Sequence, residues 1–283
     1  DNDTYESAEK QYLQNNSKQA ISGFTSYVSK FPNGLHALKA NFYLAQLYFA
    51  DNLEANSVKH YDFVVSKPRN EFTEQSLARL CQVHLKAKNY DSAIPVLKRL
   101  ETEAEFPQNK TYAQSNLMKS YYEKQDFVNA VIYADKVLLS DKIDDRIKSD
   151  AQIIVARSTI KTNDETKAKD AYAKLNKIAK GELKAEALYY DAYFKNKEGK
   201  FDASNTVVEK IASDYSGYKF FGAKALIIMA KNYFSLNDSF QATEILQSVI
   251  DNFTEYADVV AEAQKELDAI KIEEAKRNSS ITN

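Results

Sequence analysis

Three histidines and one cysteine are the side chains of this 283-residue chain with the clearest capacity for chemistry. Histidine ligates metals and transfers protons near neutral pH, and a cysteine thiolate is a nucleophile. Here His36, His60 and His84 fall in different expected helices, and Cys81 stands alone. The sequence contains no His-Glu-x-x-His, no Gly-x-Ser-x-Gly and no glycine-rich phosphate loop. We therefore interpret these residues as packing residues and expect no enzyme, no metal and no cofactor.

Charge and composition narrow the function classes further. Acidic residues alternate with lysine, as in Glu182-Lys184-Glu186, which is typical of a solvated helix surface rather than of acid–base catalysis. The net charge of -2 gives no electrostatic reason to expect a nucleic-acid partner. The apolar runs are far shorter than the roughly 20 residues that cross a bilayer, so we expect no direct membrane insertion. Because the chain begins at Asp1, we expect a processed or trimmed protein.

A repeat runs through the whole chain and supplies the elements that would position any site. Small or slender residues recur at steps of 37, 36, 37, 38, 36 and 38 residues: Ala8, Ala45, Cys81, Met118, Ala156, Ala192 and Ala230. A second column of small residues follows after twelve positions, or after ten in the second unit: Ala20, Ala55, Ala93, Ala130, Ala168, Ser204 and Ala242. Small side chains at such spacing let two helix backbones approach closely. Each unit therefore predicts a helical hairpin.

Turn residues and apolar periodicity set the expected boundaries. We expect seven helix pairs at about 4–33, 36–69, 72–107, 109–141, 145–180, 182–217 and 219–254. A capping helix is expected over 257–275, with Val260, Leu267 and Ile270 on its apolar side and charges elsewhere. Residues 277–283 are expected to form a flexible tail. No linker divides the chain, so we expect a single domain over 1–276.

The repeat resembles the tetratricopeptide repeat family over essentially the whole chain. The best matching units are the fourth and the seventh, through Leu117-Met118, Tyr121, Phe127, Ala130 and Ala134, and through Met229-Ala230, Tyr233 and Ala242. The resemblance implies an all-α fold, a right-handed α-solenoid of about seven helix hairpins plus a C-terminal capping helix. Asp191 occupies a place where the family has leucine, which opens the first helix of the sixth unit to a shift in register.

The family lines the concave face of its superhelix with the first helix of each pair, which implies a ligand groove here. Candidate partner-binding residues on those helices are Phe42, Gln46, Arg79, Gln82, Lys119, Arg157, Tyr189, Tyr193 and Lys231. The residue directly after each member of the first small column is acidic or neutral at the N-terminal end and mostly basic beyond the fourth unit. A partner with apolar anchors and acidic charge would therefore be complementary. The alternatives are packing between helices for the aromatic members and an ordinary solvated face for the basic ones.

These observations lead to a hypothesis of a non-enzymatic scaffold that binds a protein or peptide partner in the groove. One alternative is a rigid spacer or assembly arm that contacts partners through its convex face or its ends. An enzyme would require His60, His84 and a carboxylate to converge in one pocket. The unit endings Phe31-Pro32 and Tyr215-Ser216 are similar to those of the bacterial cell-envelope branch of the family. That likeness favours the periplasm or the outer-membrane periphery, with the cytoplasm as the alternative.

Overall fold

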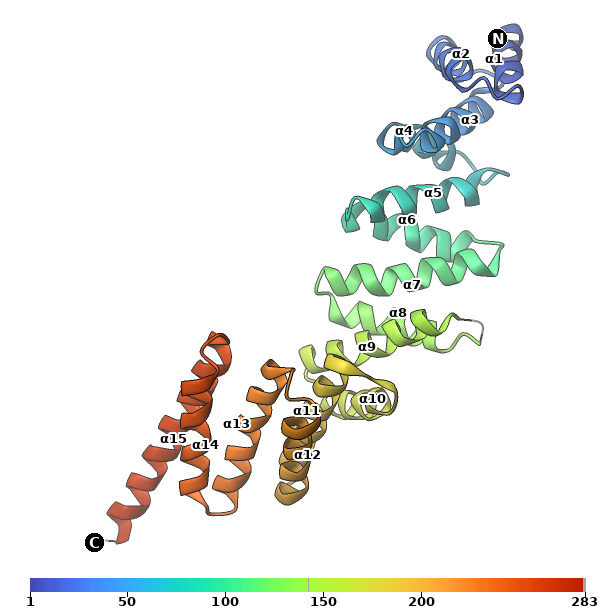
Figure 1. Cartoon of the computed structure of the whole chain (residues 1–283). Coiled ribbons are helices and arrows are strands. Elements are labelled where there is room, and N and C mark those ends of the chain that lie inside the picture. Colours follow the sequence, from blue (N-terminus) through green and yellow to red (C-terminus); the bar gives the residue numbers. More distant parts are fainter. Residues whose placement is uncertain (142, 282–283) are drawn as a thin grey trace. The chain divides into compact units, whose positions relative to one another are not determined.

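The computed structural model describes residues 1–141 and 143–281, and helices account for the regular structure of this part (Figure 1). The predicted all-α fold is confirmed. The helices of the described residues are α1 Asn2–Leu13, α2 Ser17–Lys30, α3 Ala37–Ala50, α4 Glu54–Ser66, α5 Thr73–Lys86, α6 Tyr90–Glu103, α7 Pro107–Glu123, α8 Phe127–Leu138, α9 Asp145–Lys161, α10 Glu165–Ile178, α11 Gly181–Lys197, α12 Phe201–Asp214, α13 Lys219–Ser235, α14 Ser239–Asn252 and α15 Ala257–Ile281. Their order along the chain agrees with seven pairs and one further helix, and contacts within a pair join α1 to α2, α3 to α4, α5 to α6, α7 to α8, α11 to α12 and α13 to α14.

The chain divides into two compact units, residues 1–158 and residues 159–283. The boundary between them lies within helix α9. In the first unit consecutive helices from α1 to α8 pack against one another as successive hairpins. In the second unit α11 pairs with α12, α13 pairs with α14, and α15 packs on both α13 and α14. Each unit is thus a stack of the same hairpin. The single domain over 1–276 stays a prediction.

The small-residue columns lie where the two helices of a pair meet. All seven residues of the first column are buried, with exposures of 2% for Ala8 and 0% for Cys81, Met118 and the others. In the first pair a Cβ built on Gly23 would lie only 2.7 Å from the Cβ of Ala8, so glycine is required for that approach. The column therefore reports backbone contact between helices, as the sequence predicts.

One member of the second column was assigned to the wrong residue. Ala55 is exposed, whereas Ser57 is fully buried and lies twelve residues after Ala45, as in every other unit. The serine hydroxyl donates to the backbone oxygen of Glu54 at 2.6 Å, which satisfies its polar group inside the hairpin. A preference for alanine over serine misled the sequence assignment, although either side chain is small enough for the contact.

The turn within each hairpin has one backbone requirement. The residue seven positions after the first column has positive φ in every unit: Asn15, Asn52, Lys88, Gln125, Asn163, Gly199 and Asn237. Asparagine and glycine tolerate this left-handed conformation well, which explains their frequency here. The next residue caps the second helix in four units through a side-chain oxygen that accepts a backbone N–H: Asn89, Asp126, Asp164 and Asp238.

Two helices bear on expectations drawn from the sequence: α11, the first helix of the sixth unit, and α15, the last helix. Helix α11 keeps the common register, because Ala192 is fully buried in the first column. The apolar side of α15 contains Val259 at 2% exposure together with Leu267 and Ile270, so Val259 rather than Val260 faces the core. Helix α15 continues to Ile281, into the segment expected as a tail, and residues 282–283 lie outside the described residues.

The corrected column predicts opposite outcomes for two leucine substitutions in α4. Ser57→Leu forces a large side chain between α3 and α4 and is expected to lower the free energy of unfolding by about 1–3 kcal/mol. Ala55→Leu places the same side chain on the surface and is expected to change stability by less than about 0.5 kcal/mol. Urea denaturation followed by circular dichroism measures both. Equal effects of the two substitutions would contradict the assignment of Ser57.

Candidate partner-binding surfaces

A cavity of about 480 Å³ opens beside α5 in the first unit and contains two predicted residues, Arg79 and Gln82. Arg79 donates to the side-chain oxygen of Gln82 at 2.9 Å, and its guanidinium lies 4.5 Å from the ring centroid of Phe49. The aromatic face holds the guanidinium in place while Gln82 remains exposed. The cavity therefore presents ordered polar groups to solvent, a property that suits recognition of another chain.

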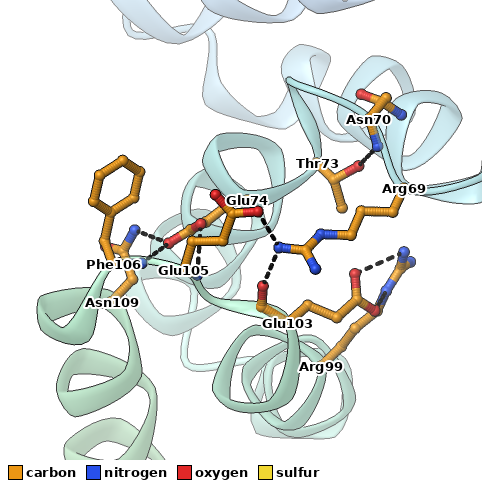
Figure 2. Close-up of polar contacts among 9 residues, drawn as sticks. All are labelled: Arg69, Asn70, Thr73, Glu74, Arg99, Glu103, Glu105, Phe106 and Asn109. Carbon is orange, nitrogen blue, oxygen red and sulfur yellow. Dashed lines mark hydrogen bonds and ion pairs between the residues drawn. The ribbon is translucent and has the colours of Figure 1, made fainter.

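Glu74, in the first turn of α5, forms the wall of this cavity and joins it to the next hairpin (Figure 2). Its carboxylate accepts hydrogen bonds from the backbone N–H of Glu105 at 2.9 Å and of Phe106 at 3.2 Å, and from the side-chain amide of Asn109 at 2.7 Å. Burial alone would raise the pKa of Glu74, but these hydrogen bonds outweigh it and hold the pKa below the usual value. Glu74 thus stays ionised and fixes the loop between α6 and α7.

Two arginines complete the connection between the second and third hairpins, as Figure 2 shows for their side chains. Arg69 donates to the backbone oxygen of Glu103 at 2.9 Å and pairs with Glu105 at 2.7 Å. Arg99 pairs with Glu103 at 2.5 Å and donates to the backbone oxygen of Val65 at 2.6 Å. Sequence reasoning missed these residues. The signal was present, because several of the bonds join residues one repeat length apart, with separations of 34 to 36 residues.

A second cavity, of about 630 Å³, lies between α13 and α15 in the second unit and contains the predicted residue Lys231. Lys231 pairs with Glu266 of α15 at 2.7 Å, so its charge is balanced within the chain. Phe234 and Ile270 add apolar surface to the cavity. The guanidinium of Arg277 lies 5.3 Å from the ring centroid of Phe234. This cavity combines an apolar floor with charged edges.

The remaining polar candidates are engaged with neighbouring helices. Lys119 pairs with Asp150 of α9 at 2.5 Å, Gln46 accepts a hydrogen bond from Tyr12 at 3.2 Å, and Tyr193 donates to Glu165 at 3.1 Å. Arg157 lies half-buried on α9. Lys119 and Lys231 each meet a carboxylate of a following helix, so the sequence overestimated the positive charge that these two residues offer to a partner. Their acidic partners are separated from them by 31 and 35 residues, about one repeat.

Phe42 and Tyr189 occupy a different environment from the other candidates. Their exposures are 4% and 7%, and Phe42 stacks on Phe72 with ring centroids 4.3 Å apart. A side chain buried to this extent offers almost no surface to another molecule. Inter-helix packing, the alternative reading of the aromatic column, accounts for both residues, and neither is carried into the surface proposed below.

Two of the residues with catalytic potential, His60 and Cys81, are buried. His60 is 6% exposed, and its Nδ1 lies 2.8 Å from the side-chain oxygen of Asn41. The pKa of His60 is lowered to about 4, first by burial and then by the charge of Lys59. Burial raises the pKa of the Cys81 thiol to about 12, which makes it a poor nucleophile at neutral pH. Within the described residues no group of three or more His, Cys, Asp or Glu side chains could hold a metal ion.

Known proteins show the same architecture. The sequence pattern of the tetratricopeptide repeat matches residues 224–255, which span most of α13 and all of α14. A solved structure, the C-terminal part of a tetratricopeptide repeat-containing protein from Cytophaga hutchinsonii, aligns with 91% of this chain and 98% of its own length at 15% identity and a TM-score of 0.52. Residues 224–255 thus match the tetratricopeptide repeat family, and the described helices have the fold of tetratricopeptide repeat proteins.

A second solved structure is also similar to this chain. A tetratricopeptide repeat protein from Parabacteroides merdae covers 93% of this chain and 98% of its own length at 12% identity, with a TM-score of 0.43. No curated protein sequence matches the chain. Among the described helices, none has the length and apolar character needed to cross a membrane. Tetratricopeptide repeat proteins are typically scaffolds that bind protein or peptide partners.

The Glu74 contacts predict a specific loss of stability. Glu74→Gln removes the charge that accepts two backbone N–H groups, and we expect the free energy of unfolding to fall by about 1–2 kcal/mol at neutral pH. Because the folded pKa lies below the ordinary value of 4.5, the stabilisation is present above that value and disappears as pH falls through the folded pKa. Urea denaturation at neutral and acidic pH measures this difference. The matched control Glu71→Gln removes an exposed charge from the same cavity, and an equal effect would contradict the role of Glu74.

Buried His60 predicts a pH dependence of stability. In the unfolded chain the imidazole takes up a proton below 6.5, whereas in the folded chain it stays neutral until about 4. Stability due to this group is therefore complete above 6.5 and falls by about 3 kcal/mol as pH drops towards 4. We expect His60→Gln to flatten this part of the profile, measured by denaturation at several pH values. His36→Gln is the control, and an equal flattening by both variants would contradict the assignment.

Proposed function

We propose that the chain is a non-enzymatic scaffold that holds a peptide or protein segment along its first helices. One observation carries the proposal. Two separate cavities, of about 480 and 630 Å³, lie against first helices and contain the residue that directly follows the first small column. These residues are Gln82 in α5 and Lys231 in α13. A repeated structure that opens a cavity at the same repeat position in two hairpins supports binding of a partner segment at each of these cavities.

The chemistry of the two cavities indicates what each would contact. The first is lined mainly by charged and amide side chains, among them Arg79, Gln82 and Asn109, which can pair with the backbone groups of a bound segment. The second offers Phe234 and Ile270 beside polar edges, which suits an aliphatic or aromatic anchor. A preformed surface of this kind orders little of itself on binding, so more of the contact energy appears as affinity.

The bacterial cell envelope remains our proposed setting. It rests on the unit endings Phe31-Pro32 and Tyr215-Ser216 noted in the sequence. The periplasm or the outer-membrane periphery would place the scaffold among envelope assemblies, and the cytoplasm is the alternative. The identity of its compartment does not alter the chemistry of the two cavities.

A rigid assembly arm is the second candidate, and one feature of α8 favours it. Three large apolar side chains at its outward positions and its end are exposed: Val128 at 61%, Ile132 at 48% and Leu139 at 83%. In α6 the corresponding positions hold Asp91, Pro95 and Thr102. Contact through this outer face would leave the first helices without a partner.

Site-specific photo-crosslinking distinguishes the two candidates. Benzoylphenylalanine replaces Gln82 on α5, Ile132 on α8 or, as a control, Thr102 on the polar outer side of α6, all of which are exposed. We expect position 82 to crosslink a partner protein in cells that make this chain, and mass spectrometry to map the partner segment. Crosslinks from position 132 with none from position 82 would support the assembly arm instead. Crosslinks of equal yield from all three positions would contradict a defined binding surface.

A further inference from the structure

The junction between α10 and α11 departs from the packing that joins the other hairpins. The residue before the first small column is apolar at each of the other junctions: Leu44, Leu80, Leu117, Val155 and Met229. In the sixth unit this residue is Asp191. The residue three positions after the column is Tyr48, His84, Tyr121, Thr159 or Tyr233 at those junctions, and here it is Lys195. Because α11 keeps its register, two charged groups occupy positions that hold an apolar residue and, in four of the five other units, an aromatic ring.

These exchanges coincide with a cavity of about 360 Å³, the α10–α11 pocket. Its lining includes five lysines and two carboxylates, a surplus of three positive charges: Lys169, Lys177, Lys184, Lys195 and Lys200, with Asp191 and Glu198. Phe194 and the buried Tyr172 also line the pocket. The predicted groove residues Tyr189 and Tyr193 do not line it, so the pocket is distinct from the surfaces described above.

Asp191 and Glu198 neutralise only part of the positive charge of the five lysines. Asp191 pairs with Lys195, and Glu198 pairs with Lys169 and, at 2.8 Å, with Lys200. Lys184 donates to the backbone oxygen of Asn176 rather than to a carboxylate. Among the described residues, Lys177 and Lys184 have no acidic partner within ion-pair distance. Burial, and then repulsion from Lys210, lowers the pKa of Lys184, and the negative charge of Asp191 offsets only part of this effect.

The exchange is unfavourable for the hairpin stack itself. Apolar side chains at this junction would remove hydrophobic surface from water, whereas lysine and aspartate leave the pocket open. The side-chain oxygen of Asn176 is buried without a hydrogen-bond partner, another departure from a well-packed interface. Local departures that reduce stability are concentrated at functional sites. We propose that the α10–α11 pocket binds an acidic peptide segment of a partner protein.

The spread of the lysines favours a peptide over a small anion. Lys169 and Lys177 lie eight residues apart on α10, a distance of about 12 Å along a helix. Lys184 and Lys195 extend the charge along α11. An extended chain advances roughly 3.3 Å per residue, so about four acidic residues would span this length. A single phosphate group would reach one end only and leave the remaining surplus charge unmatched.

Fluorescence anisotropy with a fluorescein-labelled peptide of about six consecutive glutamates tests the proposal on the full chain. We expect saturable binding that weakens as salt increases. The variant Lys169→Glu/Lys177→Glu/Lys200→Glu reverses three exposed charges of the pocket and is expected to weaken binding at least about tenfold. The control Lys18→Glu/Lys39→Glu/Lys265→Glu makes the same change in net charge at exposed positions elsewhere, and we expect a change below about threefold.

A second test replaces the charged residues at positions 191 and 195 with the residues that other units have there. This variant is expected to fold at least as stably as the wild type. Asp191→Leu/Lys195→Tyr restores the common packing residues, so we expect a higher thermal midpoint together with loss of peptide binding. The proposal is overturned if this variant binds the peptide as the wild type does, or if both charge-reversal variants weaken binding equally. It is also overturned if inorganic phosphate or an oligonucleotide binds more tightly than the peptide with the same lysine dependence. None of these outcomes affects crosslinking at Gln82.

Discussion

Close approach of two helix backbones is the constraint on which this molecule depends. Each hairpin brings its helices together at two small residues twelve positions apart, and the residues of both columns are almost fully buried once Ser57 is assigned to the second. A single hairpin cannot cover its own apolar face, so every pair requires a neighbour. The left-handed turn residue seven positions after the first column then starts the second helix at a constant point. Repetition of one local geometry therefore produces the stack.

Polar bonds between residues one repeat apart define how successive hairpins meet. Glu74 holds the backbone of the next inter-hairpin loop, Arg69 and Arg99 hold the carbonyls and carboxylates beside it, and Lys231 meets a carboxylate of the capping helix. The exposed ion pairs among these contacts contribute little to stability individually, in contrast to the backbone hydrogen bonds that Glu74 accepts. Their effect on recognition is larger, because they neutralise charges that the sequence alone would offer to a partner and they order the edges of the cavities.

Packing and binding compete for the same positions in a repeat protein. Phe42 and Tyr189 lie on first helices, yet they serve packing. At the α10–α11 junction the balance is reversed, since the charged Asp191 and Lys195 occupy positions that hold uncharged or aromatic side chains, most of them leucine or tyrosine, at the other junctions. A stack of similar hairpins tolerates one such exchange because stability is distributed over many nearest-neighbour contacts. Deviation from the repeat is therefore as informative about function as the repeat itself.

The sequence by itself determined the helical class, the seven pairs, the capping helix and the turn positions, because these depend on residue size, period and backbone conformation within short segments. It also showed that Gln82 and Lys231 occupy equivalent places. Only the tertiary structure decided that Ser57 rather than Ala55 is the contact residue, and that Val259 rather than Val260 faces the core. It also decided which side chains are satisfied by neighbours and which line a cavity. Those properties depend on contacts between residues about one repeat apart, which a local pattern does not encode.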